Sequence, residues 1–377
     1  MSNSQKIKTA AMFILVIFIL PILSMCSKKK TFSEAENRSL AKKPEISLSA
    51  VKDKSYMNDL EAYISDHFTG RLSWIKMKSF TERMSGKDEI NGVYITDERL
   101  IEKLPEPDKE EVEKSVEAIN HFAELYDTKV YFLLAPTSAG IYRDKISKLA
   151  SQEDQKSFIG SVYSRLSENV TSIDIYDTMY SARDKYIYYR NDHHWTSFGA
   201  YKAYSYAIEK LGLRAVDYSK YSVEHASSDF KGTFYSKCLY NGIKPDVIDI
   251  YSYDEGSHIT GVNMNDGTEE SHAGDIYFRE YLKTNDKYCV FLGRNQAYMN
   301  IKTDVRNDKK ILVIKDSYAN SFVPFLTQNY SEISVIDLRY VKNSIKDFVN
   351  PNDYDQVLFL YNASTFSTDQ NVKVAGF

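Results

Sequence analysis

The stretch Lys310–Ser321, which reads KILVIKDSYANS, decides the fold of this chain. Its first half is a continuous apolar run of strand length, typical of a buried parallel strand. The second half predicts a helix over about 318–328. Ser317 lies at the junction, so we expect its side chain at the carboxyl end of a strand, where open α/β sheets hold ligands and nucleophiles.

The same alternation of short apolar strands and helices extends outward on both sides of this stretch. Strands are predicted at 93–95, 129–135, 172–175, 333–338 and 356–361, and helices at 108–126, 152–168 and 197–211. Such alternation favours a parallel sheet with helices on both faces. We therefore expect an α/β domain over 88–377, with an irregular insertion rich in Ser, Gly, Asp and Tyr at about 213–286.

Residues 31–87 have a different character. They begin as a polar linker, 31–56, and continue with apolar positions at helical spacing between 57 and 85. We expect a linker followed by short helices, lying between the leader, 1–30, and the α/β domain.

The sequence of the N-terminus predicts a membrane-targeting segment. Lys6 and Lys8 precede the apolar run Ala10–Met25, which is the pattern of an export leader. Three interpretations fit this run: a cleaved signal peptide, a lipoprotein leader ending at Cys26, or an uncleaved anchor. Each places the residues after about 30 outside the cytoplasm. The expected location is extracytoplasmic, either membrane-anchored through the N-terminus or secreted.

Composition narrows the classes of function. The formal net charge of −4 gives no basic excess, so nucleic acid is not an expected partner. The three cysteines form no CxxC pair, which argues against a structural zinc site. Cys238 and Cys289 are expected to be free, buried thiols. Nothing in the sequence calls for a cofactor.

A second polar cluster, Asn191–Thr196, reads NDHHWT and precedes a helix. A serine nucleophile needs a base, and a histidine base needs a carboxylate that fixes its tautomer. Asp192 and His194 are two residues apart and can face one cleft. Two other interpretations stay open: a solvated polar loop, and a metal site built from Asp192, His193 and His194. At the first stretch, Asp316 or Ser317 could simply cap the helix.

The segment Asp192-His193-His194-Trp195 resembles the motif that names the DHHW family of bacterial exported proteins. Further blocks resemble recurring segments of that family: Glu36–Arg38, Phe68–Arg71, Gly232–Lys237, Asp316–Tyr318 and Pro324-Phe325. The family is similar to SGNH-like proteins that O-acetylate alginate and related exopolysaccharides. Those proteins carry an Asp-x-His-Trp motif well before a Gly-Asp-Ser motif, an order circularly permuted from ordinary SGNH esterases.

This resemblance implies an SGNH-hydrolase-like fold with the permuted motif order. It implies Ser317 as nucleophile, His194 as general base and Asp192 as the residue that orients the base. Lys315 stands where the alginate proteins have glycine. Candidates for the oxyanion hole and for substrate contacts are Tyr318, Asn320, Gly293 and Arg190.

The implied activity is an O-acyltransferase, with acetyl as the acyl group, acting on an extracytoplasmic or exported polysaccharide. A membrane acyl-transporting acyltransferase is the expected partner. Two alternatives stay open. One is a carbohydrate esterase of the same fold, and the other is an inactive polysaccharide-binding scaffold.

Overall fold

The computed structural model describes residues 3–147, 150, 154–265, 271–272 and 275–376. The chain forms two compact units. The first contains Met1–Ile90 and Tyr235–Gly242, and the second contains Asn91–Phe234 and Ile243–Phe377. The described cysteines, Cys26, Cys238 and Cys289, are free thiols.

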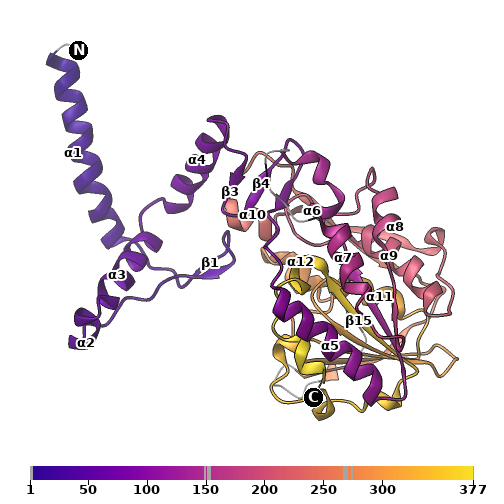
Figure 1. The fold of residues 1–377 in the computed structure, drawn as a ribbon. Helices are drawn as coiled ribbons and strands as arrows, with labels where there is room; N and C mark the ends of the chain where they lie inside the picture. Colours follow the sequence, from indigo (N-terminus) through magenta and orange to yellow (C-terminus); the bar gives the residue numbers. More distant parts are fainter. Residues whose placement is uncertain (1–2, 148–149, 151–153, 266–270, 273–274, 377) are drawn as a thin grey trace. The chain divides into compact units, whose positions relative to one another are not determined.

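The second unit is built on an eight-stranded sheet with the order β11-β10-β12-β14-β13-β15-β6-β7 (Figure 1). Its strands are β6 Lys129–Ala135, β7 Val170–Ser172, β10 Ile259–Asn265, β11 Ser271–His272, β12 Tyr298–Thr303, β13 Lys310–Lys315, β14 Glu332–Ile336 and β15 Gln356–Asn362. The five strands from β14 to β7 are parallel, as predicted. The β12, β10 and β11 strands pair antiparallel, so the sheet is mixed rather than wholly parallel.

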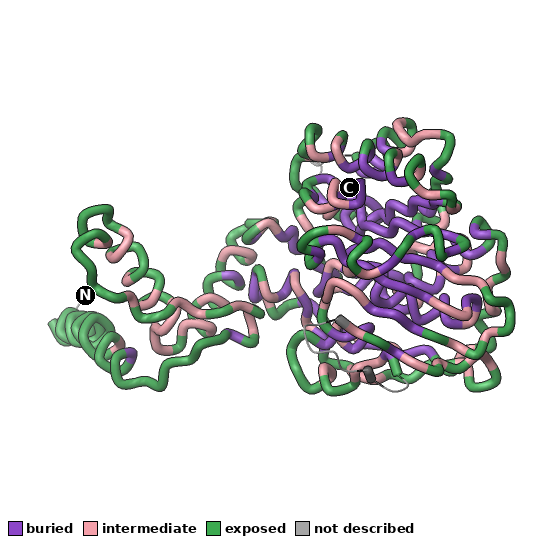
Figure 2. Tube along the Cα trace, turned by 90° about the horizontal axis from the view of Figure 1, so that it is seen from below, coloured by how far each residue is buried: buried purple, intermediate pink, exposed green. Residues whose placement is uncertain are grey.

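Strand β13 lies between β14 and β15, inside the parallel part. Ile311–Ile314 and Val357–Leu360 are fully buried on both strands, which explains their unbroken apolar sequences. Figure 2 shows the same burial along the strands of this unit. The carboxyl end of β13 is therefore fixed by a tightly packed core on each side.

Helices follow the strands in the expected alternation. The second unit contains α5 Lys109–Leu125, α6 Ser138–Ile141, α7 Gln155–Tyr163, α8 Tyr176–Ser181, α9 Ser197–Lys210, α11 Ala319–Leu326 and α12 Ala363–Phe366. The Asp108 carboxylate caps α5, and the Thr196 hydroxyl caps α9 by accepting the Gly199 N–H. Short 3₁₀ turns are η1 Arg143–Lys145, η2 Tyr218–Lys220, η3 Arg279–Lys283, η4 Lys287–Val290, η5 Leu338–Tyr340, η6 Ile345–Asp347, η7 Pro351–Asp353 and η8 Val372–Gly376.

The stretch 213–286 is more regular than its composition suggested. Strands β8 Ser222–Phe230 and β9 Asp246–Ser252 form an antiparallel pair, β10 joins the main sheet, and α10 spans Thr233–Cys238. A second antiparallel pair, β4 Val93–Ile95 and β5 Leu100–Glu102, begins the unit. The strand predicted at 172–175 ends at Ser172 instead. Ile173 and Ile175 are fully buried all the same, but in the segment that leads into α8.

The first unit contains α1 Asn3–Cys26, β1 Phe32–Ser33, β2 Arg38–Ser39, α2 Leu48–Lys52, α3 Ser55–Asp66, α4 Arg71–Met84 and β3 Glu89–Ile90. In the described part of the chain, α1 is the one helix long and apolar enough to cross a membrane. Two family-like blocks meet here in the ion pair of Glu36 with Arg71, and Arg38 pairs with Asp66 just before the second block. The Arg38 hydrogen bond lowers the pKa of Asp66 to about 2.

Candidate active site

The turn after β13 is built around the side chain of Asp316. Its Oδ2 accepts hydrogen bonds from the main-chain N–H and the Nδ2 of Asn362, at 2.8 and 2.7 Å, and its Oδ1 accepts the Tyr318 N–H at 2.8 Å. Its own N–H donates to the carbonyl of Leu360. Asp316 thus ties the turn to β15, and its burial raises its pKa. Ser317 follows on this rigid turn and is only half-buried.

Trp195 locks the second polar cluster against the same turn. Its fully buried indole donates from Nε1 to the Tyr318 carbonyl and to Ser321 Oγ, both at 3.0 Å. A bridge to Tyr188 holds the other side of the loop. The loop that carries Asp192 and His194 is therefore bonded to the turn that carries Ser317 and is buried rather than solvated.

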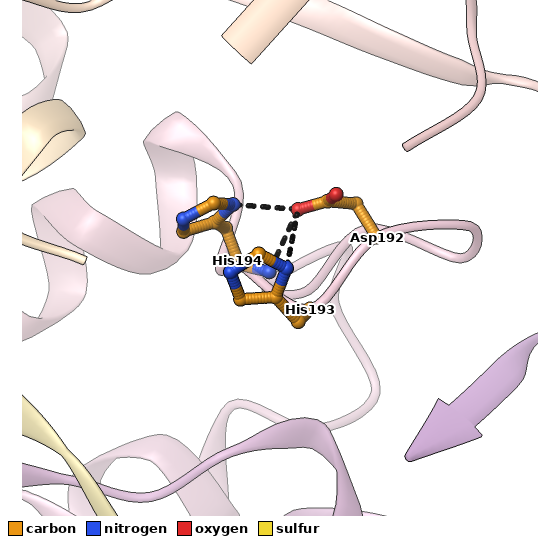
Figure 3. A group of neighbouring side chains, drawn as sticks. All are labelled: Asp192, His193 and His194. Atoms are coloured by element: carbon orange, nitrogen blue, oxygen red, sulfur yellow. Dashed lines mark hydrogen bonds and ion pairs between the residues drawn. The ribbon is translucent and has the colours of Figure 1, made fainter. Parts of the chain in front are cut away.

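The three predicted side chains lie in one hydrogen-bonded row. The His194 Nε2 is 2.8 Å from Ser317 Oγ, and its Nδ1 is 2.6 Å from Asp192 Oδ1. Asp192 Oδ1 also accepts the His194 main-chain N–H at 2.9 Å, and its Oδ2 accepts the Thr233 N–H at 2.7 Å. Figure 3 shows the histidine end of this row, with Asp192 facing both rings. This is the arrangement in which a histidine can take a proton from a serine.

The electrostatics keep Asp192 charged although it is buried. Burial alone would raise its pKa, but the neighbouring imidazoles of His193 and His194, the His194 hydrogen bond and the Thr233 N–H hold that pKa well below its ordinary value. Gly232 makes this enclosure possible, because a Cβ there would lie 2.0 Å from Asp192 Oδ2. Sequence reasoning assigned no role to Gly232 or Thr233, although both fall in a block quoted for the family resemblance.

His193 lies beside the row rather than in it. Its Nδ1 is 3.6 Å from Asp192 Oδ1, and its ring centre is 3.8 Å from that of His194. Burial and the neighbouring His194 charge lower the pKa of His193 to about 4, so it is neutral at neutral pH. Asp192, His193 and His194 have possible metal-ligand atoms within 4.8 Å of one another. The Asp192 carboxylate is already engaged by His194 and Thr233, which favours the triad over the metal interpretation.

Tyr288 is the residue that sequence reasoning missed. Its ring stacks on the His194 imidazole with centres 3.6 Å apart and planes 9° from parallel. Its hydroxyl lies 3.1 Å from both the Ser317 carbonyl and Ser321 Oγ, so one buried side chain contacts both the His194 ring and the Ser317 peptide. Tyr288 is far from both motifs in sequence, and its short 3₁₀ turn carries no recognisable signal.

One main-chain donor is available beside the nucleophile. The N–H groups of Tyr318, Ala319 and Asn320 donate to Asp316 Oδ1, the Asp316 carbonyl and the Ser317 carbonyl, respectively. Within the described part of the chain, the N–H of Ser317 itself has no hydrogen-bond partner. An unpaired N–H next to a nucleophilic oxygen is suited to hold a developing oxyanion.

The other predicted site residues have different surroundings. The Tyr318 hydroxyl donates to the His193 carbonyl at 2.5 Å, which places Tyr318 inside the site. Asn320 accepts from Lys315 Nζ at 2.7 Å, and Lys315 also reaches Asp337 at 3.4 Å. Burial lowers the pKa of Lys315, against the opposing effect of Asp337.

Gly293 and Arg190 make no hydrogen bond to the triad among the described residues. Gly293 has a φ of 73° and faces the ring of Phe278. The Arg190 guanidinium lies over the Tyr186 ring, 4.4 Å from its centre, and 3.7 Å from Asp246. The structure therefore brings Asp192, His194, Ser317 and Tyr318 together and leaves these two apart.

Comparisons with known proteins agree with the fold described above. A DHHW family protein from Eubacterium siraeum has a TM-score of 0.67 and 26% identity over 76% of this chain and 95% of its own. Bacillus cereus PatB1 has a TM-score of 0.62 and 23% identity over 74% of this chain and 98% of its own. A search of curated protein sequences finds no match. The family model of the DHHW protein matches residues 110–336, more than half of the sequence, and the chain therefore belongs to the DHHW family.

Proposed function

We propose that this chain is a serine-dependent O-acyltransferase, with acetyl as the acyl group, acting on an extracytoplasmic or exported polysaccharide. One observation carries the proposal. His194 contacts Ser317 Oγ through one nitrogen and a buried, charged Asp192 through the other. The site lies at the carboxyl end of a parallel strand, where this class of fold carries its nucleophiles.

In the first step, Ser317 Oγ attacks the carbonyl carbon of the acyl donor while its proton passes to His194 Nε2. The resulting tetrahedral intermediate collapses to an ester on Ser317. The leaving group departs with the proton that His194 returns. One bond to the acyl carbon forms and one breaks, so this step needs no oxidant.

Two kinds of charge need stabilisation during this step. The positive charge on His194 faces the Asp192 carboxylate at its edge and the Tyr288 ring on its face, and both contacts favour an imidazolium. The negative charge on the former carbonyl oxygen needs a donor, and the Ser317 N–H is free to provide one.

In the second step, a sugar hydroxyl attacks the acyl-Ser317 ester. His194 takes the proton of that hydroxyl and returns it to Ser317 Oγ, which leaves the acetylated sugar and the starting enzyme. Water can make the same attack, and it would give an esterase. A transferase must therefore hold its acceptor oriented close to Ser317, which raises its effective concentration far above that of a free molecule.

The supply of acyl groups completes the proposal. An extracytoplasmic enzyme needs a donor delivered across the membrane, so we propose a membrane acyl-transporting acyltransferase as partner. The apolar helix α1 would keep the chain at that membrane. Bacillus cereus PatB1 has also been solved with a sulfonyl adduct. A sulfonyl reagent is accordingly a suitable probe for Ser317 here.

The test uses the purified full chain in detergent, an activated acetyl ester, and envelope or exopolysaccharide oligosaccharides. Transfer predicts slow hydrolysis alone and acetylated oligosaccharide in the presence of acceptor, with both lost in Ser317→Ala. Fast hydrolysis with no acetylated product from any glycan would show an esterase. No turnover, together with an unchanged cell-envelope acetylation phenotype in Ser317→Ala, would show a scaffold.

A further inference from the structure

Helix α4 presents its large apolar side chains to the outside. Trp74, Met77, Phe80 and Met84 are between 46% and 73% exposed. At about 100° per residue these four positions fall on one arc of the helix, and the other residues on that arc, Ser73 and Thr81, carry no charge. We call Trp74, Met77, Phe80 and Met84 the α4 stripe.

The opposite face of α4 shows that this orientation is fixed. Ser79 is buried and donates to the carbonyl of Cys238 at 2.6 Å, in the same compact unit. Leu72 and Ile75, on the same side, are half-buried. The helix thus turns a serine and two smaller apolar residues inward and its bulkiest apolar residues outward, the reverse of a helix that faces water.

Two lysines border the stripe. By helical geometry, Lys76 lies beyond one edge of the arc and Lys78 beyond the other, and the one carboxylate of the helix, Glu82, lies on the far side. An apolar arc with a basic residue on each border is typical of helices that lie in a membrane surface, because the long lysine stems let their ammonium groups reach lipid phosphates.

The start of α4 is attached to the end of the membrane-length helix α1. Ser24, in the last turn of α1, accepts the Thr69 N–H at 2.8 Å and donates to Thr69 Oγ1 at 3.1 Å. His67 Nε2 lies 3.0 Å from the Lys30 carbonyl. Lys28, Lys29 and Lys30 follow α1 at once, which is where a spanning helix leaves the apolar layer.

From these contacts we infer that α4 lies on the surface of the membrane that α1 enters, an anionic phospholipid bilayer. Trp74, Met77, Phe80 and Met84 would lie between the headgroups and the acyl chains, with Lys76 and Lys78 at the phosphates. The stripe needs an apolar partner, and a bilayer entered by α1 would supply one next to the start of α4. The inference does not depend on the catalytic proposal.

The chain provides its own probe for this inference, because its two tryptophans are Trp74, in the stripe, and Trp195, which is fully buried. The full chain is reconstituted in phosphatidylglycerol–phosphatidylcholine vesicles with acyl chains brominated near the headgroup. The difference between the spectra of wild type and Trp74→Phe isolates the Trp74 emission. We expect brominated lipid to remove most of that emission and aqueous iodide to leave it unchanged.

A charged variant makes the test independent of α1. Phe80→Glu should release Trp74 from bromine quenching and expose it to iodide, while the protein stays in the vesicles. The matched control Asn58→Glu adds a charge to exposed α3 and should change neither signal. Quenching of wild-type Trp74 by iodide but not by bromine would place the stripe in water. Quenching by neither would mean that a protein surface covers it, and either result overturns the inference.

Discussion

Two histidine–aspartate pairs in this chain have hydrogen bonds of the same length and lie in different surroundings. His194 and Asp192 are joined at 2.6 Å between Nδ1 and Oδ1, and so are His225 and Asp249. The His194 side chain is 6% exposed, whereas the His225 side chain is 75% exposed. His194 also contacts Ser317 and stacks on Tyr288, while His225 has no serine partner among the described residues.

The same bond can therefore have very different surroundings, and the surroundings, not the bond, support the role proposed for His194 and Asp192. At the exposed pair, water and salt screen the attraction between the two side chains, so the interaction adds little to stability. At the buried pair, no water competes, and the same contact fixes the tautomer and steadies a positive charge. The two pairs therefore differ in their burial and in the contact of His194 with Ser317.

The largest expected effect comes from breaking each pair in turn. Asp192→Asn should lower kcat for the acetyl ester by about 10⁴-fold, because an asparagine holds the wrong tautomer of His194. Asp249→Asn should leave kcat unchanged. Steady-state kinetics of the two variants decide the matter, and an equal loss in both would remove the distinction drawn here.

Next in size is the enclosure of Asp192. Gly232→Ala places a Cβ where Asp192 Oδ2 now lies and should push the carboxylate away from His194 and Thr233. A displacement of about 1 Å can cost about 10²-fold in rate, so kcat should fall by about that factor.

The control for this variant is Gly160→Ala in α7. Among the described residues, no atom outside the helix's own backbone lies within 4 Å of the added Cβ, so the change should stabilise that helix slightly. A Gly232→Ala enzyme with wild-type kcat would show that Asp192 can move without consequence.

The Tyr288 contacts should have a smaller effect. Tyr288→Leu removes both the ring face and the hydroxyl and should lower kcat by about 10-fold, the scale of a cation–π contact in a desolvated site. Tyr288→Phe keeps the face and loses one hydrogen bond to the Ser317 peptide, so a loss of a few-fold is expected.

Tyr189→Phe is the matched control, since the Tyr189 ring contacts Tyr288 and its buried hydroxyl has no hydrogen-bond partner among the described residues. If Tyr288→Phe and Tyr189→Phe lower kcat equally, the Tyr288 hydroxyl has no special role.

The smallest effect concerns stability. The pKa of His193 is lowered from its ordinary value of 6.5 to about 4, so between these values the unfolded chain binds more protons than the folded one. The neutral His193 ring therefore makes its full contribution to the free energy of unfolding above pH 6.5, and this contribution is lost as the pH falls toward about 4. Asp192, whose pKa is also lowered, loses its contribution at lower pH, outside this window.

Urea unfolding of Trp74→Phe protein, in which Trp195 is the remaining tryptophan, should therefore show stability falling from neutral pH to about pH 4. In His193→Asn that part of the fall should be smaller. Identical pH profiles in the two proteins would mean that the surroundings of His193 do not disfavour its protonation.

Much of the fold and of the candidate site could be predicted from sequence, because short stretches of residues carry the patterns that indicate them. An unbroken apolar run specifies a strand buried on both faces, and β6, β13 and β15 lie where such runs occur. Ser317 and the Asp192–His194 pair stand in short motifs at the ends of elements. Lys315, which replaces a glycine, does not have the positive φ that only glycine adopts easily, so the turn forms without it.

What could not be predicted depends on contacts between distant segments. Tyr288 acts through a ring face and a hydroxyl that only the folded chain brings to His194 and Ser317. Gly232 matters because of how close Asp192 lies to it. The antiparallel β10 and β12 strands extend the sheet beyond its parallel part, and strand order is not written in any one strand's apolar pattern.

We expect Ser317 to react as a nucleophile because the buried Asp192 carboxylate holds the His194 ring against it, and covalent labelling of Ser317 can show this. The full chain is treated with phenylmethylsulfonyl fluoride, and the modified residue is identified by peptide mass spectrometry. We expect a single sulfonyl group on Ser317, formed at the wild-type rate in His225→Asn and far more slowly in Asp192→Asn. An unmodified Ser317, or one modified equally fast in Asp192→Asn, would contradict this expectation.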